Sequence, residues 1–363
     1  MPAIDHWSSL RDRLIISSDV RDAVQFHRMY SYMEKCVSDY AATPVARLSV
    51  RIDGRPCAID LKLEGLSPWQ SIKGRTALGL MASVAHRVGP NTTVVESTSG
   101  NLGVALARMC QDVGLRFIAI VDAALPLAMR NGMLDAGAEL REVTGAEGGS
   151  GVASRVREAE RCAGEDPDVV WPNQYGNAGN TTVHEYWTGP ELAETVDLAG
   201  TAVLAPVSTG GTLGGITRYL RAHQPTTRAV GVDVVGSAAF GNEPRRRALT
   251  GIGSGLKSRF VTASDCDDVV AVADDEGVSA CLRVAELTGL SLGGSSGAAV
   301  AAARRYLSAN EDLDRVVCIC PDMGENYTET IYNPGWVRSG GFGNAMSDFE
   351  IQPTVLSGTG VRA

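Results

Sequence analysis

The chain has 363 residues, with 33 Lys and Arg against 42 Asp and Glu, and a formal net charge of −9. This length can bury a large core and predicts two domains. The acidic balance argues against nucleic-acid and anionic-membrane partners, because both are bound through clustered basic residues. No stretch approaches the roughly 18 consecutive apolar residues of a membrane span, and residues 1–7 lack the basic and then apolar pattern of an export signal. A soluble cytoplasmic protein is therefore expected.

Residues 1–40 have a helical pattern, in which Ser18 or Asp19 can cap a segment with apolar residues near a helical period. Two arrangements of this N-terminal helical extension fit the pattern equally well. It either contacts a partner subunit or a sheet edge, or it packs on its own domain. Two strands are then predicted at 45–53 and 57–64, joined by a turn-rich sequence, Asp53-Gly54-Arg55-Pro56.

Helix and strand patterns alternate from Lys73 onward, which predicts parallel α/β sheets covered by helices on both faces. Seven strands plus the early pair suit two sheets better than one. The glycine-rich segment 147–151 is predicted to be a flexible connector, although its pattern alone could bind phosphate, and the tail at 346–363 is predicted to be loosely ordered. The predicted strands after Lys73 are 92–96, 116–121, 139–143, 168–171, 201–206, 228–235 and 315–320.

Eight cysteines are dispersed along the chain, too widely for a disulfide-stapled small domain. Cys318 and Cys320 alternate in a strand pattern, so a metal-binding pair is conceivable, but no His or Cys partner follows nearby in the sequence. The five histidines show no metal spacing either. Buried reduced thiols and no metal are therefore predicted.

The segment from Leu63 to Thr76 contains a single lysine, Lys73, after a turn-forming Ser67-Pro68 pair. Residues 70–71 (Gln-Ser) can cap a helix that follows. Backbone N–H groups at a helix start disfavour the ammonium form of a lysine, which leaves more of the free amine that a Schiff-base lysine needs. The alternative is a solvated surface lysine.

Two glycine-bearing loops each follow an apolar run and precede a helical pattern. Residues 96–103 (ESTSGNLG) offer short hydroxyls and N–H groups that suit a carboxylate. Residues 207–215 (VSTGGTLGG) have neither the Gly-Lys-Ser/Thr ending of a nucleotide P-loop nor the spacing of a dinucleotide fingerprint. The second loop therefore reads as a phosphate cup without a lysine.

Together, Lys73 and the two loops resemble the fold-type II pyridoxal-phosphate family of cysteine synthases and related β-replacing enzymes. A fourth motif at 292–298 (LGGSSGA) fits the same family, and the resemblance runs from about Thr43 to about Val337. Within the family, the sequences at 100–103, 206–209, 240–241 and 251–253 look like those of the N-(2-amino-2-carboxyethyl)-L-glutamate synthases. These enzymes open the route to 2,3-diaminopropionate in siderophore and peptide-antibiotic biosynthesis.

The resemblance implies a fold of two three-layer α/β domains with mostly parallel sheets, like that of the tryptophan synthase β subunit. The N-terminal domain, 54–177, would carry Lys73 and the carboxylate loop. The C-terminal domain, 41–53 and 178–345, would carry the phosphate cup, with the cofactor, pyridoxal 5′-phosphate, in the cleft between the domains. The family also implies a homodimer that acts on small amino-acid substrates.

The resemblance further implies roles for individual residues. Lys73 would form the internal aldimine and then remove the α-proton of the substrate. Asn101 would hydrogen-bond the ring hydroxyl, although an Asn after Gly is often only a turn residue, and Ser295 would face the pyridine nitrogen. The cofactor phosphate would be held by Ser208, Thr209, Gly210, Gly211 and Thr212, of which Ser208 stands where the family usually has glycine. The substrate α-carboxylate would be held by Thr98, Ser99, Gly100, Leu102 and Gln174.

A neutral hydroxyl at the pyridine nitrogen gives a weaker electron sink than a carboxylate would, which suits elimination of a β-leaving group over transamination. Gly74 replaces an aspartate that is commoner in the family after the lysine, so the sequence does not show how Arg75 is fixed. The run Arg245-Arg246-Arg247 stands in an otherwise acidic protein. Guanidinium groups suit a phosphate ester, so Arg247, with Arg245, is predicted to recognise O-phospho-L-serine. A solvated basic patch is the alternative.

The predicted reaction is β-replacement, in which O-phospho-L-serine loses phosphate to leave an aminoacrylate. L-glutamate then adds to give N-(2-amino-2-carboxyethyl)-L-glutamate. The alternative is a cysteine synthase that combines O-acetylserine or O-phosphoserine with sulfide. A catalytically inactive scaffold protein is a third hypothesis, which the four intact cofactor motifs disfavour.

Overall fold

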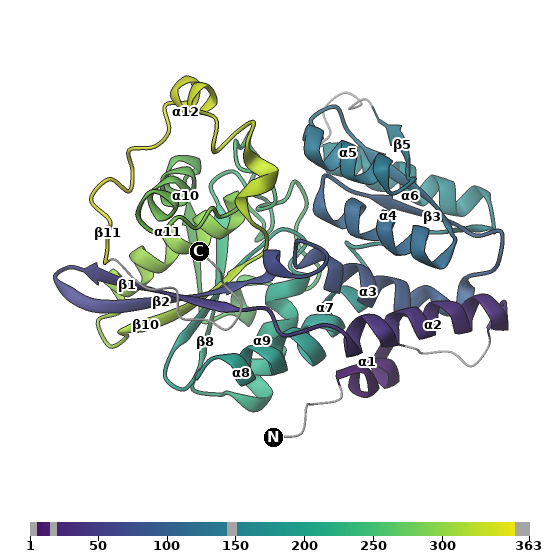
Figure 1. Ribbon diagram of the computed structural model, residues 1–363, viewed down its shortest axis with the longest axis horizontal. Coiled ribbons are helices and arrows are strands. Elements are labelled where there is room, and N and C mark those ends of the chain that lie inside the picture. The colour runs from purple at the N-terminus through teal and green to yellow at the C-terminus, as the bar shows by residue number, and fades with distance from the viewer. Residues whose placement is uncertain (1–5, 15–19, 144–150, 353–363) are drawn as a thin grey trace. The chain divides into compact units, whose positions relative to one another are not determined.

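The computed structural model describes residues 6–14, 20–143 and 151–352 and divides the chain into two units (Figure 1). Unit 1 contains Met1–Tyr40 and Lys73–Thr188, and unit 2 contains Ala41–Ile72 and Gly189–Ala363. Each unit combines one sheet with several helices. This confirms the predicted α/β class.

Unit 1 is built on a four-stranded parallel sheet with the order β5-β4-β3-β6. The central strand β3 is buried along its whole length, which explains why it reads as an apolar run. The strands are β3 (Thr93–Ser97), β4 (Arg116–Val121), β5 (Glu139–Glu142) and β6 (Val169–Val170). The helices are α1 (His6–Leu14), α2 (Ala23–Ser38), α3 (Lys73–Val84), α4 (Asn101–Val113), α5 (Leu127–Asp135), α6 (Gly151–Glu165), α7 (Gly179–Val183), the 3₁₀ turn Ala85–Arg87 and the π-helical turn His184–Thr188.

The N-terminal helix α2 packs on unit 1 itself, which is one of the two predicted arrangements. Its side chains Met29 and Met33 are buried, and Gln25 Nε2 donates a hydrogen bond to the Val113 carbonyl at 3.0 Å. The helix is capped by Asp22, whose carboxylate accepts from the Gln25 N–H at 2.7 Å. The predicted caps Ser18 and Asp19 lie outside the described residues, as does most of the predicted connector at 147–151.

Unit 2 is built on a seven-stranded sheet with the order β11-β1-β2-β10-β7-β8-β9. Strands β11, β1 and β2 pair antiparallel, and the rest pair parallel. The strands are β1 (Val45–Ile52), β2 (Arg55–Leu63), β7 (Ala202–Pro206), β8 (Arg228–Val234), β9 (Asp268–Val272), β10 (Arg315–Cys320) and β11 (Glu350–Ile351). The helices are α8 (Gly189–Thr195), α9 (Gly211–His223), α10 (Asp274–Thr288), α11 (Gly294–Ala309), α12 (Pro334–Gly340) and the 3₁₀ turns Glu64–Leu66, Ala263–Asp265 and Gly324–Tyr327.

Helices pack on both faces of this sheet. Successive side chains of a strand point to opposite faces, so each strand contributes to the core on both sides. Ala202 and Leu204 of β7 pack in the core with residues of α10 and α11, such as Val284 and Val300. Val203 and the other side chains of the opposite face pack with residues of α8 and α9. Figure 1 shows α10 and α11 on one side of the strands, and α8 and α9 on the other. The sheet is therefore the middle of three layers.

The structure differs from the predicted domain limits near the N-terminus. Strand β2 pairs with β1 antiparallel and with β10 parallel, so residues 54–72 belong to unit 2, not to the domain predicted for 54–177. Unit 1 also includes residues 1–40 and continues to Thr188. Two strands were not predicted: β9, and β11, which lies in the described part of the tail that was expected to be loosely ordered.

All eight cysteines are free thiols. Six are buried, as predicted, whereas Cys36 and Cys266 are partly exposed. Burial raises the pKa of every one of these thiols above its ordinary value. Within the described residues, no group of three or more His, Cys, Asp or Glu could hold a metal ion.

Candidate active site

Lys73 is the first residue of α3, and its side chain is only partly exposed. Burial lowers the pKa of its amine to about 8, although the Glu96 carboxylate of the same unit opposes this shift. A substantial fraction of the amine is therefore neutral near physiological pH. This is the state that nucleophilic attack on an aldehyde requires.

The predicted carboxylate loop connects β3 to α4 and begins at Ser97. Thr98 is buried, and its hydroxyl oxygen accepts hydrogen bonds from the N–H groups of Gly100 at 3.2 Å and Gly103 at 3.0 Å. Thr98 therefore shapes the loop by capping α4, whereas Ser99 is exposed. The Ser97 Oγ atom is buried and has no hydrogen-bond partner among the described residues. A buried hydroxyl in this state fits a site that accepts a polar ligand.

Gln174 lies beside this loop although it is distant in sequence. The Gln174 side-chain amide donates to the Ser97 backbone carbonyl at 2.6 Å. The Gln174 backbone carbonyl accepts from Asn180 Nδ2 at 2.7 Å. Strands β3 and β6 are parallel neighbours, so the segments after their carboxyl ends meet at one edge of the sheet. The structure thus brings Gln174 together with the loop predicted to hold the substrate carboxylate.

Arg75, whose fixation was left open by the sequence, is fully buried within unit 1. Its guanidinium carbon lies 4.7 Å from the ring centroid of Tyr40 and 4.7 Å from that of Trp187. Such contacts with aromatic faces stabilise a desolvated cation. Aromatic residues from two other segments thus fix the first turn of α3, next to Lys73.

His184 was not predicted from the sequence but contacts the same turn of α3. Its Nε2 lies 3.1 Å from the Thr76 hydroxyl, and its Nδ1 lies 2.9 Å from the Thr188 hydroxyl. Burial, with the charges of Lys73 and Arg75, lowers the pKa of His184 well below its ordinary value. His184 is therefore a neutral hydrogen-bonding residue that holds α3 in place.

In unit 2, the predicted phosphate cup, Ser208–Thr212, lies between β7 and α9. Gly210, the N-cap residue of the helix, has a left-handed φ of 91° and no side chain, and the Gly211 N–H donates to Thr209 Oγ1 at 3.5 Å. Ser258 Oγ donates to the Thr209 carbonyl at 2.8 Å and would lie 2.2 Å from a Cβ at position 210. The first N–H groups of this 13-residue helix thus follow a glycine turn, and the hydrogen bond from Ser258 holds that turn in place. This arrangement fits an anionic phosphate.

Ser295 is the second residue of α11 and is 1% exposed. A Cβ on Gly251 would lie 3.9 Å from Ser295 Oγ and 3.4 Å from the Tyr327 hydroxyl, so these groups lie in one neighbourhood. Asp322 fixes this region: its carboxylate accepts from the Tyr327 hydroxyl at 2.7 Å, and its carbonyl accepts from Ser296 Oγ at 3.0 Å. Asp322 and Tyr327 were not predicted. Their only sequence signal is their position directly after the last long strand.

Arg247 lies in the long segment between β8 and β9. Its Nη1 donates to the Gly236 carbonyl at 2.6 Å, and the Ser254 carbonyl lies 3.5 Å away. It therefore braces this segment, whereas Arg245 and Arg246 are exposed. Recognition of a substrate phosphate by Arg247 stays a prediction.

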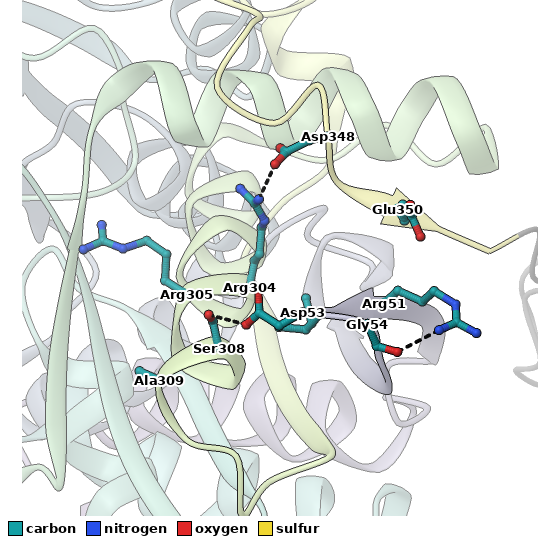
Figure 2. Close-up of a pocket in the computed structure, with 10 residues that line it drawn as sticks. Arg51, Asp53, Gly54, Arg304, Arg305, Ser308, Ala309, Asp348 and Glu350 are labelled. Carbon is teal, nitrogen blue, oxygen red and sulfur yellow. Dashed lines mark hydrogen bonds and ion pairs between the residues drawn. The ribbon is translucent and has the colours of Figure 1, made fainter.

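A cavity of about 630 Å³ lies at the other end of α11 and is drawn in Figure 2. Two of its interactions are the ion pair of Arg304 with Asp348 at 2.8 Å and the hydrogen bond from Ser308 to Asp53 at 2.6 Å. Ser295 lies in the first turn of α11 and Ser308 in its last turn, so this cavity is separate from the predicted site residues. Its acidic and basic side chains largely neutralise each other.

Comparison with known proteins decides the family. Residues 38–322 match the model of the family described as pyridoxal-phosphate dependent enzyme. The chain belongs to this family. It is therefore a pyridoxal-phosphate enzyme of the cysteine synthase type, as the four motifs predicted.

No helix among the described residues is long and apolar enough to span a membrane.

Two curated relatives bear the name N-(2-amino-2-carboxyethyl)-L-glutamate synthase. The relative from Ralstonia nicotianae is 37% identical over 314 residues, which cover 84% of this chain and 93% of the relative. The relative from Cupriavidus metallidurans is 34% identical over 322 residues, which cover 87% of this chain and 94% of the relative.

Solved structures confirm the fold-type II architecture. The O-acetylserine-dependent cystathionine β-synthase of Helicobacter pylori matches with a TM-score of 0.74 and 28% identity, over 81% of this chain and 97% of that chain. An O-ureido-L-serine synthase matches with a TM-score of 0.74 and 25% identity, over 82% of this chain and 95% of that chain. Both likenesses extend over most of the present chain.

Proposed function

We propose that this enzyme catalyses β-replacement, in which O-phospho-L-serine and L-glutamate give N-(2-amino-2-carboxyethyl)-L-glutamate and inorganic phosphate. The observation that carries the proposal is the 37% identity, over 84% of the chain, to a synthase of that name. The Lys73 amine with its lowered pKa and the polar loop after β3 supply the chemistry that such a reaction needs. The product would serve the synthesis of 2,3-diaminopropionate for a siderophore or a peptide antibiotic.

The residues present fit the cofactor. The glycine turn at the start of α9 suits its phosphate, the Lys73 amine suits its aldehyde, and Ser295 would lie at the ring nitrogen with Asn101 at the ring hydroxyl. When bound, pyridoxal phosphate supplies an electron sink for the α-carbon of an amino acid. The protein supplies placement and proton transfer.

Lys73 carries the proton transfers in this proposal. An amine with a pKa of about 8 can accept the proton of the substrate α-carbon near neutral pH and can return it after the new bond has formed. In the net reaction, the bond from the β-carbon to the phosphate oxygen breaks, and a bond from the β-carbon to the glutamate nitrogen forms. The proton that this nitrogen loses is released to solvent or to the departing phosphate.

The start of α4 is proposed to bind the substrate α-carboxylate. Backbone N–H groups at Ser99 and Leu102 lie where the helix begins, at the positive end of its dipole, whereas the Gly100 N–H already donates to the Thr98 hydroxyl. Gln174 would add its side chain from the neighbouring segment. Thr98 contributes by holding the loop in shape, because its hydroxyl oxygen already accepts from two N–H groups of the loop.

A neutral Ser295 hydroxyl, in place of a carboxylate, would leave the ring nitrogen unprotonated. That arrangement favours loss of a β-substituent over transamination. Arg247 is proposed to meet the phosphate of the substrate through the guanidinium edge that does not contact Gly236, because its Nε atom is buried and has no partner among the described residues. The Arg247→Ala variant should then bind O-phosphoserine more weakly, and unchanged apparent affinity would count against this role.

Product analysis with paired substrates tests the proposed reaction. Protein, pyridoxal phosphate, O-phosphoserine and glutamate are mixed, and mass spectrometry should detect the mass of N-(2-amino-2-carboxyethyl)-L-glutamate. Pyruvate as the only product would contradict the proposal, and so would cysteine formed only when sulfide is supplied. The second outcome would instead support the cysteine synthase, a candidate favoured by the likeness to an O-acetylserine-dependent enzyme.

The Lys73→Ala variant is the matched control. It should lose both the product and the visible absorption band of the bound cofactor. Retention of that band would contradict the covalent role of Lys73. The proposed homodimer is tested separately by analytical ultracentrifugation of the holoenzyme.

A further inference from the structure

Glu96 is the fourth residue of β3, a strand that is buried along its whole length, and its carboxylate is fully buried. An ionised group is costly to bury unless hydrogen bonds replace its hydration. Burial raises the pKa of Glu96 to about 7, and hydrogen bonds from its surroundings oppose this shift. A residue of this kind in a core strand calls for an explanation that packing alone does not give.

The contacts of Glu96 join two separate segments of unit 1. Its Oε1 accepts from the Ser97 N–H at 2.9 Å and from Trp171 Nε1 at 3.1 Å. Its Oε2 accepts from the Gln174 N–H at 3.2 Å. One carboxylate therefore ties the first residue of the loop before α4 to the segment that follows β6.

The second segment turns sharply at Asn173. This residue adopts a left-handed φ of 59°, which Asn takes more readily than most other residues with a Cβ, and its side chain accepts from the Tyr175 N–H at 3.2 Å. Glu96 holds both sides of this position, through Trp171 and through the Gln174 N–H. The Gln174 side chain is then directed to the Ser97 carbonyl.

We propose that Glu96 is the positioning residue of the substrate-carboxylate site, because it holds the Ser97 loop and Gln174 in register with each other. The inference rests on the proposed function only in assigning the α-carboxylate to these two segments. Glu96 itself uses both oxygens on protein N–H groups, so it acts through the loop and Gln174. It is not a catalytic residue in this proposal.

The chemistry of the site requires a carboxylate in particular. Both oxygens accept hydrogen bonds, from three N–H donors on three residues. In a Glu96→Gln variant, one side-chain oxygen would still accept, but the amide nitrogen would face an N–H donor on the other side. The variant has nearly the same shape, and it would release one of the two segments.

Binding of L-serine tests the inference, because its hydroxyl leaves poorly and binding can be followed without turnover. Holoenzyme is titrated with L-serine, and the visible spectrum of the cofactor gives an apparent Kd. Glu96→Gln should raise this Kd at least 10-fold while the affinity for pyridoxal phosphate stays within about twofold. Glu160→Gln, which changes an exposed glutamate of α6 in the same unit, should bind L-serine like the wild type.

A second variant and a second measurement guard against misfolding. Trp171→Phe removes one donor to Glu96 and should raise the Kd for L-serine about two- to fivefold. In cofactor-free protein, Glu96→Gln should also accelerate backbone hydrogen exchange at Ser97 and Gln174, with no change at Glu160. An unfolded Glu96→Gln protein leaves the decision to Trp171→Phe, and a wild-type Kd in that variant would then overturn the proposal.

The outcomes separate this inference from the proposed function. A Glu96→Gln variant that binds L-serine within twofold of the wild type overturns the positioning role. A wild type that binds L-serine but forms no β-replacement product refutes the proposed reaction alone. A wild type whose spectrum does not respond to L-serine overturns the carboxylate site, and the positioning role with it.

Discussion

Substitution of Gly210 by alanine probes the phosphate cup most directly. The residue has φ 91°, and an added Cβ would lie 2.2 Å from Ser258 Oγ and 2.8 Å from Val261 Cγ1. Both distances are below any normal contact, and Ser258 is itself held by its hydrogen bond to the Thr209 carbonyl. The cup must therefore shift when the methyl group is added.

Two effects add in the Gly210→Ala variant. A left-handed conformation costs a residue with a Cβ about 1–2 kcal/mol, and overpacking of a dense region costs about 1–3 kcal/mol more. Gly200→Ala is the matched control, because Gly200 has φ 63° and no atom within 4 Å of an added Cβ. The control should show only the conformational cost, whereas Gly210→Ala should lose about 2–5 kcal/mol in total.

The assay compares unfolding in urea with titration of cofactor-free protein by pyridoxal phosphate. We expect Gly210→Ala to bind the cofactor at least 10-fold more weakly, and Gly200→Ala to bind it like the wild type. Adding Ser258→Ala to Gly210→Ala should restore part of the affinity, because it removes the nearest clashing atom. Equal cofactor affinity in the two single glycine variants would refute the assignment of the cup.

Five further predictions concern unit 1, three of substitutions and two of pH dependence. Gly79→Ala should destabilise the protein by about 1–3 kcal/mol, because the new Cβ would lie 2.3 Å from the Gly179 carbonyl. Gly164→Ala, in open space on α6, should stabilise it by about 0.5–1 kcal/mol in the same urea titration. Arg75→Lys should lower the thermal midpoint, because an ammonium group is more strongly hydrated than the guanidinium that contacts the Tyr40 and Trp187 rings; an unchanged midpoint would contradict this. The raised pKa of Glu96 should stabilise the cofactor-free protein below pH 4.5, and this contribution, roughly 3 kcal/mol, should be lost as pH rises through 7. The lowered pKa of Lys73 should make stability rise between pH 8 and 10.5. Urea titrations of the wild type across pH check both, and Glu96→Gln should flatten only the acid part.

The long parallel strands were predictable because both of their faces are buried. Strands β4 and β10 begin and end at the predicted residues, 116–121 and 315–320. Strand β9 was missed although residues 269–272 form a short apolar run; it lies at the edge of its sheet, and only Val272 is fully buried. Strand β11 has only two residues. Such a short strand depends on its partner β1, not on its own sequence.

The sequence of β2 did not indicate to which of the two units this strand belongs. The family resemblance implied a domain start at residue 54, just before β2. The strand instead pairs with β10, more than 250 residues further along the chain. Pairing over that separation leaves no local pattern in the sequence.

The candidate site was predictable where its chemistry depends on contiguous residues. Lys73, the loop at 97–102 and the cup at 208–212 each form a short motif before a helix. The supporting residues were harder to find, because each acts through a partner far away in sequence. Glu96 meets Trp171 across 75 residues, and His184 meets Thr76 across 108 residues. A charged residue directly after the apolar pair Val94-Val95 was the available sequence signal for Glu96.

The state of the eight thiols has a consequence for their reactivity. Sulfur attacks electrophiles as the thiolate, and burial raises the pKa of every cysteine of this chain, so the thiols are protonated at neutral pH. These side chains are therefore weak nucleophiles towards any electrophile that reaches them.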